Sequence, residues 1–302
     1  MPIRPMLYCA AFWALAACVP QAQNFAQPRA AQDAPRGYAR IFSPAAHAFR
    51  YTQGDEPVRL GRRAERFELQ DGDCGGSDCT APRYRSEIRM ETNRSIARVG
   101  EDVWFGWSFH NGNIASAPKA LSMKPVFGQW KTNGADPAVF RIVQIGKGEG
   151  NWTACDTRIC ERSRAAADVV VQLDAMRAAS NWGTVQNFGY ICKLFDMQDN
   201  RGKWVDIVVN TNFADDSTGY LRVWVNGGQR CDYEGPLVAD GHTGPISHRR
   251  GIFASYTARW DRQKPGTPKP TMVAYYDEFI QGRSREDVDP KLREQLRRRA
   301  VD

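Results

Sequence analysis

The segment Arg83–Glu91 reads RYRSEIRME, and the segment Val103–His110 reads VWFGWSFH. Both alternate between two kinds of side chain, which is the period of two of a β-strand and not the 3.6-residue period of a helix. In RYRSEIRME the charged residues occupy every second position, so they project from one face of a strand, and Tyr84, Ser86, Ile88 and Met90 project from the other. These two segments therefore predict a β-sheet fold in which one strand carries a charged face.

The chain from Ala39 onward repeats this pattern in short apolar stretches bounded by Gly, Asn, Asp or Pro. The turn Asn226-Gly227-Gly228 predicts a tight hairpin, because Asn and Gly tolerate positive φ angles. No amphipathic helix separates the stretches, which favours an all-β fold of two packed antiparallel sheets in one domain, residues 39–283. The further predicted strands are Pro125–Lys131, Ala138–Ile145, Asp168–Leu173, Phe188–Phe195, Trp204–Asn212, Tyr220–Asn226, Gly251–Ala258 and Met272–Ile280.

The ends of the chain differ from this domain. Residues 1–18 combine Arg4 with a short apolar run and are interpreted as a signal peptide. Leu15-Ala16-Ala17-Cys18 matches a bacterial lipobox, which would leave a lipid anchor at Cys18; the alternative is an ordinary signal cut near Ala22. Residues 19–38 have the composition of a flexible tether. Residues 284–302 form a charged tail, either a solvated surface helix or a frayed end. We expect an exported protein that is periplasmic, an outer-membrane lipoprotein or secreted.

Six of the eight cysteines lie in the predicted domain. The simplest of the possible pairings joins Cys74 to Cys79, Cys155 to Cys160, and Cys192 to Cys231. A zinc site is the alternative, but zinc-binding cysteine pairs usually lie two to four residues apart and favour a reducing compartment. None of the four histidines lies in a metal-spaced pair, so we expect no metal and no cofactor.

The formal net charge of +7 favours an anionic partner. Outside the cytoplasm we expect an acidic polysaccharide and no nucleic acid, bound by a monomer. On Arg83–Glu91 the charged row is either a solvated outer face or a surface where paired arginines bind carboxylate or sulfate. In the segment Phe127-Gly128-Gln129-Trp130-Lys131, alternation places Phe127, Gln129 and Lys131 on one face, which is either solvated or able to bind a carboxylate and accept a proton.

Six segments in order resemble the heparin-lyase-I-like polysaccharide lyases, a group akin to the alginate and glucuronan lyases: RYRSEIRME, WFGWSF, FGQWK, WVDIVVNTNF with GYLRVWVNG, RRGIFAS, and YYDEFIQG. The resemblance covers most of residues 80–282 and rests on the order of the segments, since no single one is specific. It implies a concanavalin-like β-jelly roll with a basic groove on its concave sheet, and β-elimination of a uronate-containing polysaccharide.

β-Elimination needs a base that removes the proton α to the uronate carboxylate, a group that neutralises that carboxylate, and an acid for the leaving oxygen. The resemblance places Arg85, Glu87 and Arg89 on the groove strand and gives Gln129 the neutralising role. Related enzymes have histidine where this chain has Lys131, and tyrosine where it has Phe253. We expect Lys131 as the base.

We expect Tyr256 to supply the phenol, with Tyr190 as an alternative. Substrate-binding roles are expected for Arg85, Glu87, Arg89, Arg250 and Tyr190. The competing hypotheses are a non-catalytic protein that binds acidic polysaccharide on the same scaffold, and a purely structural envelope protein with no groove.

Overall fold

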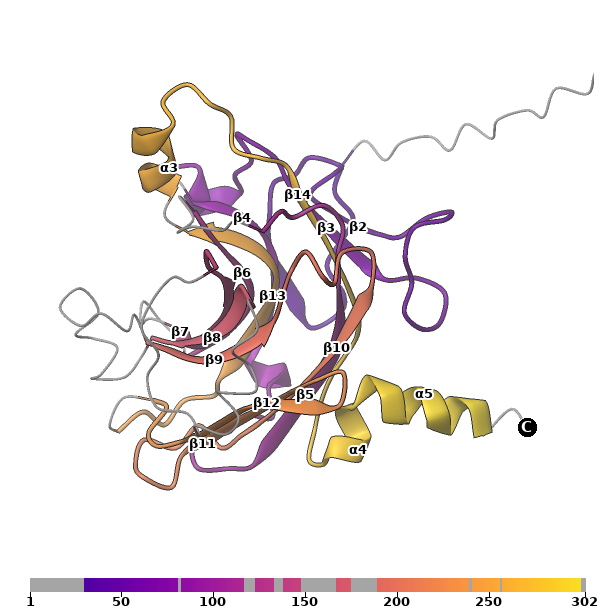
Figure 1. Ribbon diagram of the computed structural model, residues 1–302, viewed down its shortest axis with the longest axis vertical. Coiled ribbons are helices and arrows are strands. Elements are labelled where there is room, and N and C mark those ends of the chain that lie inside the picture. The colour runs from indigo at the N-terminus through magenta and orange to yellow at the C-terminus, as the bar shows by residue number, and fades with distance from the viewer. Residues whose placement is uncertain are drawn as a thin grey trace, which may run out of the picture.

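The computed structural model of this chain describes residues 30–80, 83–116, 123–132, 138–147, 167–174, 189–238, 241–255 and 257–299. Two seven-stranded antiparallel sheets pack face to face as a jelly roll (Figure 1). Sheet A contains, in spatial order, β1 (Tyr38–Ile41), β4 (Tyr84–Met90), β13 (Ser247–Ser255), β6 (Lys124–Lys131), β7 (Ala138–Gln144), β8 (Val169–Leu173) and β9 (Tyr190–Phe195). Sheet B contains β12 (Gly228–Glu234), β11 (Tyr220–Val225), β10 (Trp204–Thr211), β5 (Val103–Asn111), β14 (Met272–Gly282), β3 (Glu65–Leu69) and β2 (Phe49–Tyr51).

The predicted all-β class is confirmed, and each predicted strand overlaps a strand of the structure. The predicted hairpin is also present: β11 and β12 pair around Asn226 and Gly227, both at positive φ. The short strands β1, β2 and β3 were not predicted, because their Arg and Glu residues interrupt the apolar alternation. β13 begins four residues before the predicted Gly251 and ends at Ser255, ahead of the short helix α3 (Thr257–Gln263).

An aromatic layer fills the space between the sheets. The Trp130 ring of β6 is fully buried and stacks on Phe140 of β7 with the ring centroids 4.2 Å apart. Phe105 and Trp107 of β5 reach the same ring from sheet B. The disulfide Cys192–Cys231 joins β9 to β12, the edge strands of the two sheets, and both cysteines are fully buried. Burial of this layer supplies the main driving force that holds sheet A on sheet B.

A β-bulge in β6 changes the face that Phe127 presents. The pairing of β6 with β7 shifts register between Val126 and Gly128. Phe127 therefore turns into the interior, where its ring lies 5.2 Å from that of Phe109. The predicted row of Phe127, Gln129 and Lys131 is wrong for Phe127, because a bulge reverses the alternation and leaves no clear mark in the sequence.

The C-terminal segment is anchored to the outer side of sheet B, as Figure 1 shows. Helix α4 (Arg285–Val288) begins with a capping box between Ser284 and Asp287, and α5 (Pro290–Arg299) follows it. The carbonyl of Val288 lies so near Gly106 of β5 that a Cβ there would come within 2.0 Å of its oxygen. Arg293 of α5 pairs with Glu278 at 2.8 Å. Within the described residues, no helix has the length and apolar character needed to cross a membrane.

His248 of β13 lies inside the aromatic layer. Its ring stacks on Phe279 at 4.4 Å and lies 4.7 Å from Trp130. Both ring nitrogens are buried and have no hydrogen-bond partner among the described residues. Burial lowers the pKa of His248 well below its usual value, and nearby Arg250 lowers it further. The neutral imidazole is therefore the form that the folded protein accommodates.

We expect the free energy of unfolding to fall as the pH drops from about 7 to about 5, since the unfolded chain gains a proton on His248 that the folded chain does not. One such proton contributes at most about 1.4 kcal/mol per pH unit. The free energy of unfolding is measured by urea denaturation at several pH values. In His248→Phe it should depend less steeply on pH over this range. His110, whose pKa burial also lowers, supplies a residual slope. An unchanged slope in His248→Phe would contradict the assignment.

Candidate active site on the outer face of sheet A

The outer face of sheet A, the face turned away from sheet B, carries a row of polar residues that crosses five strands. Figure 1 shows β13 and β6 curving so that this face is concave. Each member of the row lies directly opposite the next on the neighbouring strand. From β4 to β8 the row is Arg89, Arg249, Gln129, Arg141 and Gln172.

Gln129 lies near the middle of the row, and Glu87 of β4 fixes its amide. The Gln129 Nε2 donates a hydrogen bond of 2.6 Å to Glu87 Oε1. Glu87 is 1% exposed, and burial raises its pKa, although Arg249, Arg85 and the Gln129 hydrogen bond oppose that shift. An amide nitrogen has two hydrogens, so Gln129 keeps one donor for another acceptor. Glu87 thus orients this side chain, which is itself only 4% exposed.

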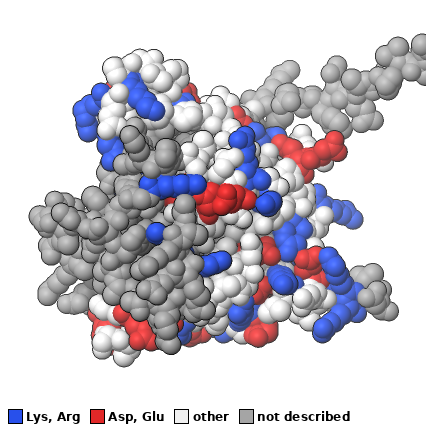
Figure 2. Space-filling view, viewed as in Figure 1, with Lys and Arg blue, Asp and Glu red and all other residues white. Residues whose placement is uncertain are grey.

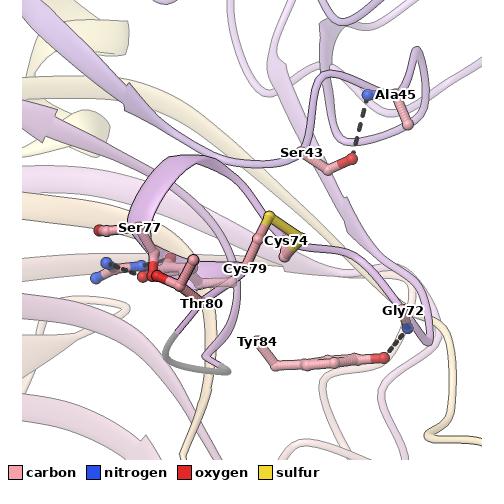
Figure 3. Close-up of a disulfide and its surroundings, with 10 residues drawn as sticks. Ser43, Ala45, Gly72, Cys74, Ser77, Cys79, Thr80 and Tyr84 are labelled. Carbon is pink, nitrogen blue, oxygen red and sulfur yellow. Dashed lines mark hydrogen bonds and ion pairs between the residues drawn. A yellow bond between two sulfur atoms is a disulfide. The ribbon is translucent and has the colours of Figure 1, made fainter.

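Arg85 connects this pair to a disulfide-closed loop. Its guanidinium holds the Asp78 carboxylate through two hydrogen bonds, one of 2.7 Å from Nη2, and its Nη1 lies 3.8 Å from Glu87 Oε2. Asp78 is 2% exposed and ends the short 3-10 turn η1 (Gly76–Asp78). The predicted disulfide Cys74–Cys79 closes that turn, as Figure 3 shows. The loop therefore determines where Arg85 lies.

Positive charge gathers at the β4 end of the row. Arg85, Arg89 and Arg249 line a cleft of about 540 Å³ between sheet A and the loop. We call it the arginine cleft; the rest of its lining is Arg40, Ile41, Phe42, Ser43, Pro44, Gly75, Gly76 and Ser77. On the face that Figure 2 shows, basic side chains also gather near α3 and near α5, with acidic ones between them.

The other end of the row is neutralised. Arg141 of β7 pairs with Asp174, with 2.8 Å between Nη2 and Oδ1, and Gln172 donates to the same oxygen at 3.0 Å. Tyr190 stands opposite Gln172 in register. Its Cα lies three strands from Gln129, about 14 Å along the sheet at the usual strand spacing. The backbone therefore does not bring Tyr190 next to Gln129.

Of the remaining predicted catalytic residues, the structure describes Lys131 but not Tyr256. Lys131 is half-buried and lies one pleat from Gln129 in β6 on the same face, with the buried Trp130 between them. Phe253 lies on this face opposite Arg85 and packs against a small apolar cluster of Val126, Val143, Ile145 and Val170. Tyr256 lies outside the described residues, as do the predicted disulfide Cys155–Cys160 and the predicted signal peptide with Cys18.

The structure does not bring Arg250 to the outer face. It is 4% exposed and points toward sheet B, where it pairs with Glu65 at 2.6 Å and lies over the rings of Tyr38 and Phe279. Arg249 takes the outer position instead. The sequence contained a signal for this choice, because Arg249 and Phe253 are four residues apart and share a face of a strand, whereas Arg250 does not share it. Asp78 and Arg141 were also missed, since their roles depend on the loop and on strand register.

No cluster of three or more His, Cys, Asp or Glu side chains is placed to hold a metal ion in the part of the chain that the structure describes. The absence of a metal or cofactor stays a prediction.

The model of the family described as polysaccharide lyase matches residues 34–280. This chain belongs to the polysaccharide lyase family. Membership of the heparin-lyase-I-like group stays a prediction. No curated protein matches the sequence.

Among solved structures, an endo-β-1,4-glucuronan lyase from the fungus Trichoderma reesei is similar, with a TM-score of 0.53 and 18% identity over 80% of this chain and 90% of that one. An alginate lyase from Alteromonas sp. 272 has a TM-score of 0.43 and 11% sequence identity, over 78% of this chain and 93% of that one. A marine PL7 alginate lyase from Zobellia galactanivorans has a TM-score of 0.44 and 10% sequence identity, over 80% of this chain and 94% of that one. The glucuronan lyase supports the fold.

The ion pair between Asp78 and Arg85 gives a stability prediction. Both side chains are nearly buried, at 3% and 10% exposure, so Asp78→Asn leaves a buried guanidinium without its carboxylate. We expect a loss of about 3 kcal/mol in the free energy of unfolding, measured in urea. The double variant Asp78→Asn/Arg85→Gln should lose less than the sum of the two single losses.

The exposed pair Arg40–Asp33 is the matched control, with side chains 56% and 95% exposed. Asp33→Asn should change stability by no more than about 0.5 kcal/mol. Equal effects of Asp78→Asn and Asp33→Asn would show that Asp78 does not hold Arg85.

Proposed function

We propose that this protein is a lyase that cleaves a uronate-containing acidic polysaccharide by β-elimination on the outer face of sheet A. The observation that carries the proposal is the Gln129 amide, which Glu87 fixes through one hydrogen while the second stays available. Arg249 lies directly opposite Gln129 on the neighbouring strand. Together they offer an amide donor and a positive charge, which suit a uronate carboxylate.

In the proposed reaction, the substrate carboxylate accepts a hydrogen bond from Gln129, and Arg249 stabilises the negative charge that develops on it as the α proton leaves. Lys131, one pleat away on the same face, accepts that proton. A lysine acts as a base only when it is neutral. The bond to the leaving glycosidic oxygen then breaks, and an acid protonates that oxygen. Tyr256 is the proposed acid.

A second function is favoured by one observation. Phe253 lies on the outer face where related enzymes have tyrosine, and a phenyl ring has no proton to give. A protein that keeps the arginines and binds an acidic polysaccharide without cleaving it is therefore the alternative.

Ultraviolet absorbance tests the proposal, because β-elimination leaves a conjugated double bond in the product. Purified protein is mixed in turn with glucuronan, alginate, heparin, chondroitin and pectin-type polymers. We expect absorbance to rise with at least one of them. Gln129→Ala and Lys131→Ala should each lower that rate about 100-fold or more, since each removes a group from the chemical step.

Exposed residues of the same types provide matched controls. Gln53 lies in a loop after β2, and Lys203 lies in the turn before β10; Gln53→Ala and Lys203→Ala should keep the wild-type rate. A flat trace with every polymer, together with salt-sensitive binding to one of them, would support the binding protein. A flat trace with no binding would refute both functions.

A further inference from the structure

The Cys74–Cys79 disulfide can be reached by a reductant, whereas the other described disulfide cannot. Cys79 is exposed and Cys74 is half-buried in the turn that Figure 3 shows. Cys192 and Cys231 are both 0% exposed and join the edge strands of the two sheets. Exposed disulfides are the ones that exchange readily with thiols and serve regulatory roles, since the attacking thiolate must reach a sulfur atom. Mild reduction should therefore open one bond and leave the other closed.

The chain just before this disulfide is firmly held. Asp73 is buried, accepts a hydrogen bond of 2.7 Å from the backbone nitrogen three residues before it, and lies 2.9 Å from Nε2 of His47. Cys74 follows directly, so these contacts fix its position. The bond to Cys79 extends that constraint across the turn. The disulfide therefore links a well-anchored part of the chain to Asp78, the residue before Cys79.

The turn itself has few other constraints. Gly75 and Gly76 lie between the cysteines, and Gly76 has a φ of +56°, in a region where glycine is free to change conformation. Inside the turn, Asp78 donates to the Gly75 carbonyl at 3.1 Å and Cys79 donates to the Gly76 carbonyl at 3.2 Å. Such hydrogen bonds add little net stability, because water replaces them in the open chain. Once the disulfide is open, the ion pair with Arg85 must order the turn alone.

Asp78 is the first member of the chain of contacts that ends at Gln129. Arg85 holds its carboxylate and lies 3.8 Å from Glu87, which accepts from the Gln129 amide at 2.6 Å. When Asp78 leaves, the buried Arg85 guanidinium turns to Glu87, because an unpaired buried charge is costly. Glu87 then has a competing donor, and the Gln129 amide can rotate. The redox state of the turn thereby reaches the candidate active site.

We propose that thiol–disulfide exchange at Cys74–Cys79 switches the site on the outer face of sheet A. In the oxidised protein Asp78 stays against Arg85, and Gln129 keeps its working orientation. In the reduced protein both are released. Asp78 is thus a positioning residue whose effect depends on the disulfide. The inference rests on the proposed function for the role of Gln129 and adds control of that role by a dithiol.

The step is a two-electron reduction by a dithiol. One thiolate of the reductant attacks the exposed Cys79 sulfur, the bond between the cysteines breaks, and Cys74 leaves as a thiolate. The second thiol of the reductant then attacks the reductant's own sulfur in the mixed disulfide, and Cys79 leaves. The protein gains the two electrons and two protons that the dithiol loses in becoming a disulfide. Exchange with an oxidised dithiol reverses the step.

Thiol mapping tests whether the reduction is selective. The folded protein is treated with dithiothreitol, its free thiols are alkylated, and mass spectrometry identifies the modified cysteines. We expect Cys74 and Cys79 to be modified while Cys192 and Cys231 stay joined. Failure of Cys74–Cys79 to open before the buried disulfide would overturn the switch.

Side-chain amide signals in NMR spectra report the consequence without any substrate. The Gln129 signals, assigned with Gln129→Ala, should shift on reduction and also in the double variant Cys74→Ser/Cys79→Ser, which keeps the turn open. The signals of Asn210, whose amide donates to Asp102 beside sheet B at 2.7 Å, are the control and should not shift. Unmoved Gln129 signals with the turn open would overturn the switch.

Ultraviolet absorbance then measures the effect on the rate. We expect the cysteine double variant to cleave about 10-fold more slowly than wild type or worse, since a small misplacement of a positioned group has effects of this size. Asp78→Asn should show a similar loss, and reduction should slow it no further, because Asp78 carries the effect. Asp33→Asn, which removes an exposed carboxylate, is the matched control and should respond to reduction as the wild type does.

Equal rates of the cysteine double variant and the wild type would overturn the switch. A further loss on reduction of Asp78→Asn would show that the effect does not pass through Asp78, which also overturns it. If the Gln129 signals move on reduction but the wild type cleaves no polymer, the lyase proposal fails and the switch stands.

Discussion

The Trp130 ring, fully buried between the sheets, stacks on Phe140 and contacts His248 and Phe105. Because side chains alternate along a strand, burying Trp130 inward turns Gln129 and Lys131 outward. In the same way, burying His248 turns Arg249 outward. The aromatic layer thus determines which residues of β6 and β13 reach the outer face. A polar site can form there because the apolar residues next to Gln129 and Arg249 in sequence are buried between the sheets.

At the outer face, charged and polar groups hold one another in place. The chain of contacts runs from Asp78 through Arg85 and Glu87 to Gln129. Each member is nearly buried, so each depends on its partners to offset the cost of leaving water. Arg89 and Arg249 lie beside this chain without such partners. The chain therefore positions Gln129, which keeps one donor for a ligand.

Alternation and turn residues were enough to predict the strands, the β11–β12 hairpin and the two-sheet class. They also placed Gln129 and Lys131 on one face. They failed where the local rule changes: the bulge in β6 turned Phe127 inward, and the choice between Arg249 and Arg250 depended on which of them faces sheet B. Long-range contacts such as Asp78 with Arg85, or Arg250 with Glu65, follow from strand order, which a single sequence does not contain.

The two described disulfides close loops of very different length, and this separates their effects. Cys192 and Cys231 are 39 residues apart, and Cys74 and Cys79 are 5 apart. In the chain-entropy account, the longer loop restricts the unfolded chain by about 4 kcal/mol and the shorter one by about 2 kcal/mol. The long crosslink therefore stabilises the fold mainly by restricting the unfolded chain. The short crosslink restricts the unfolded chain less. Its main consequence lies in the native state, where it keeps the Asp78 carboxylate in place against Arg85.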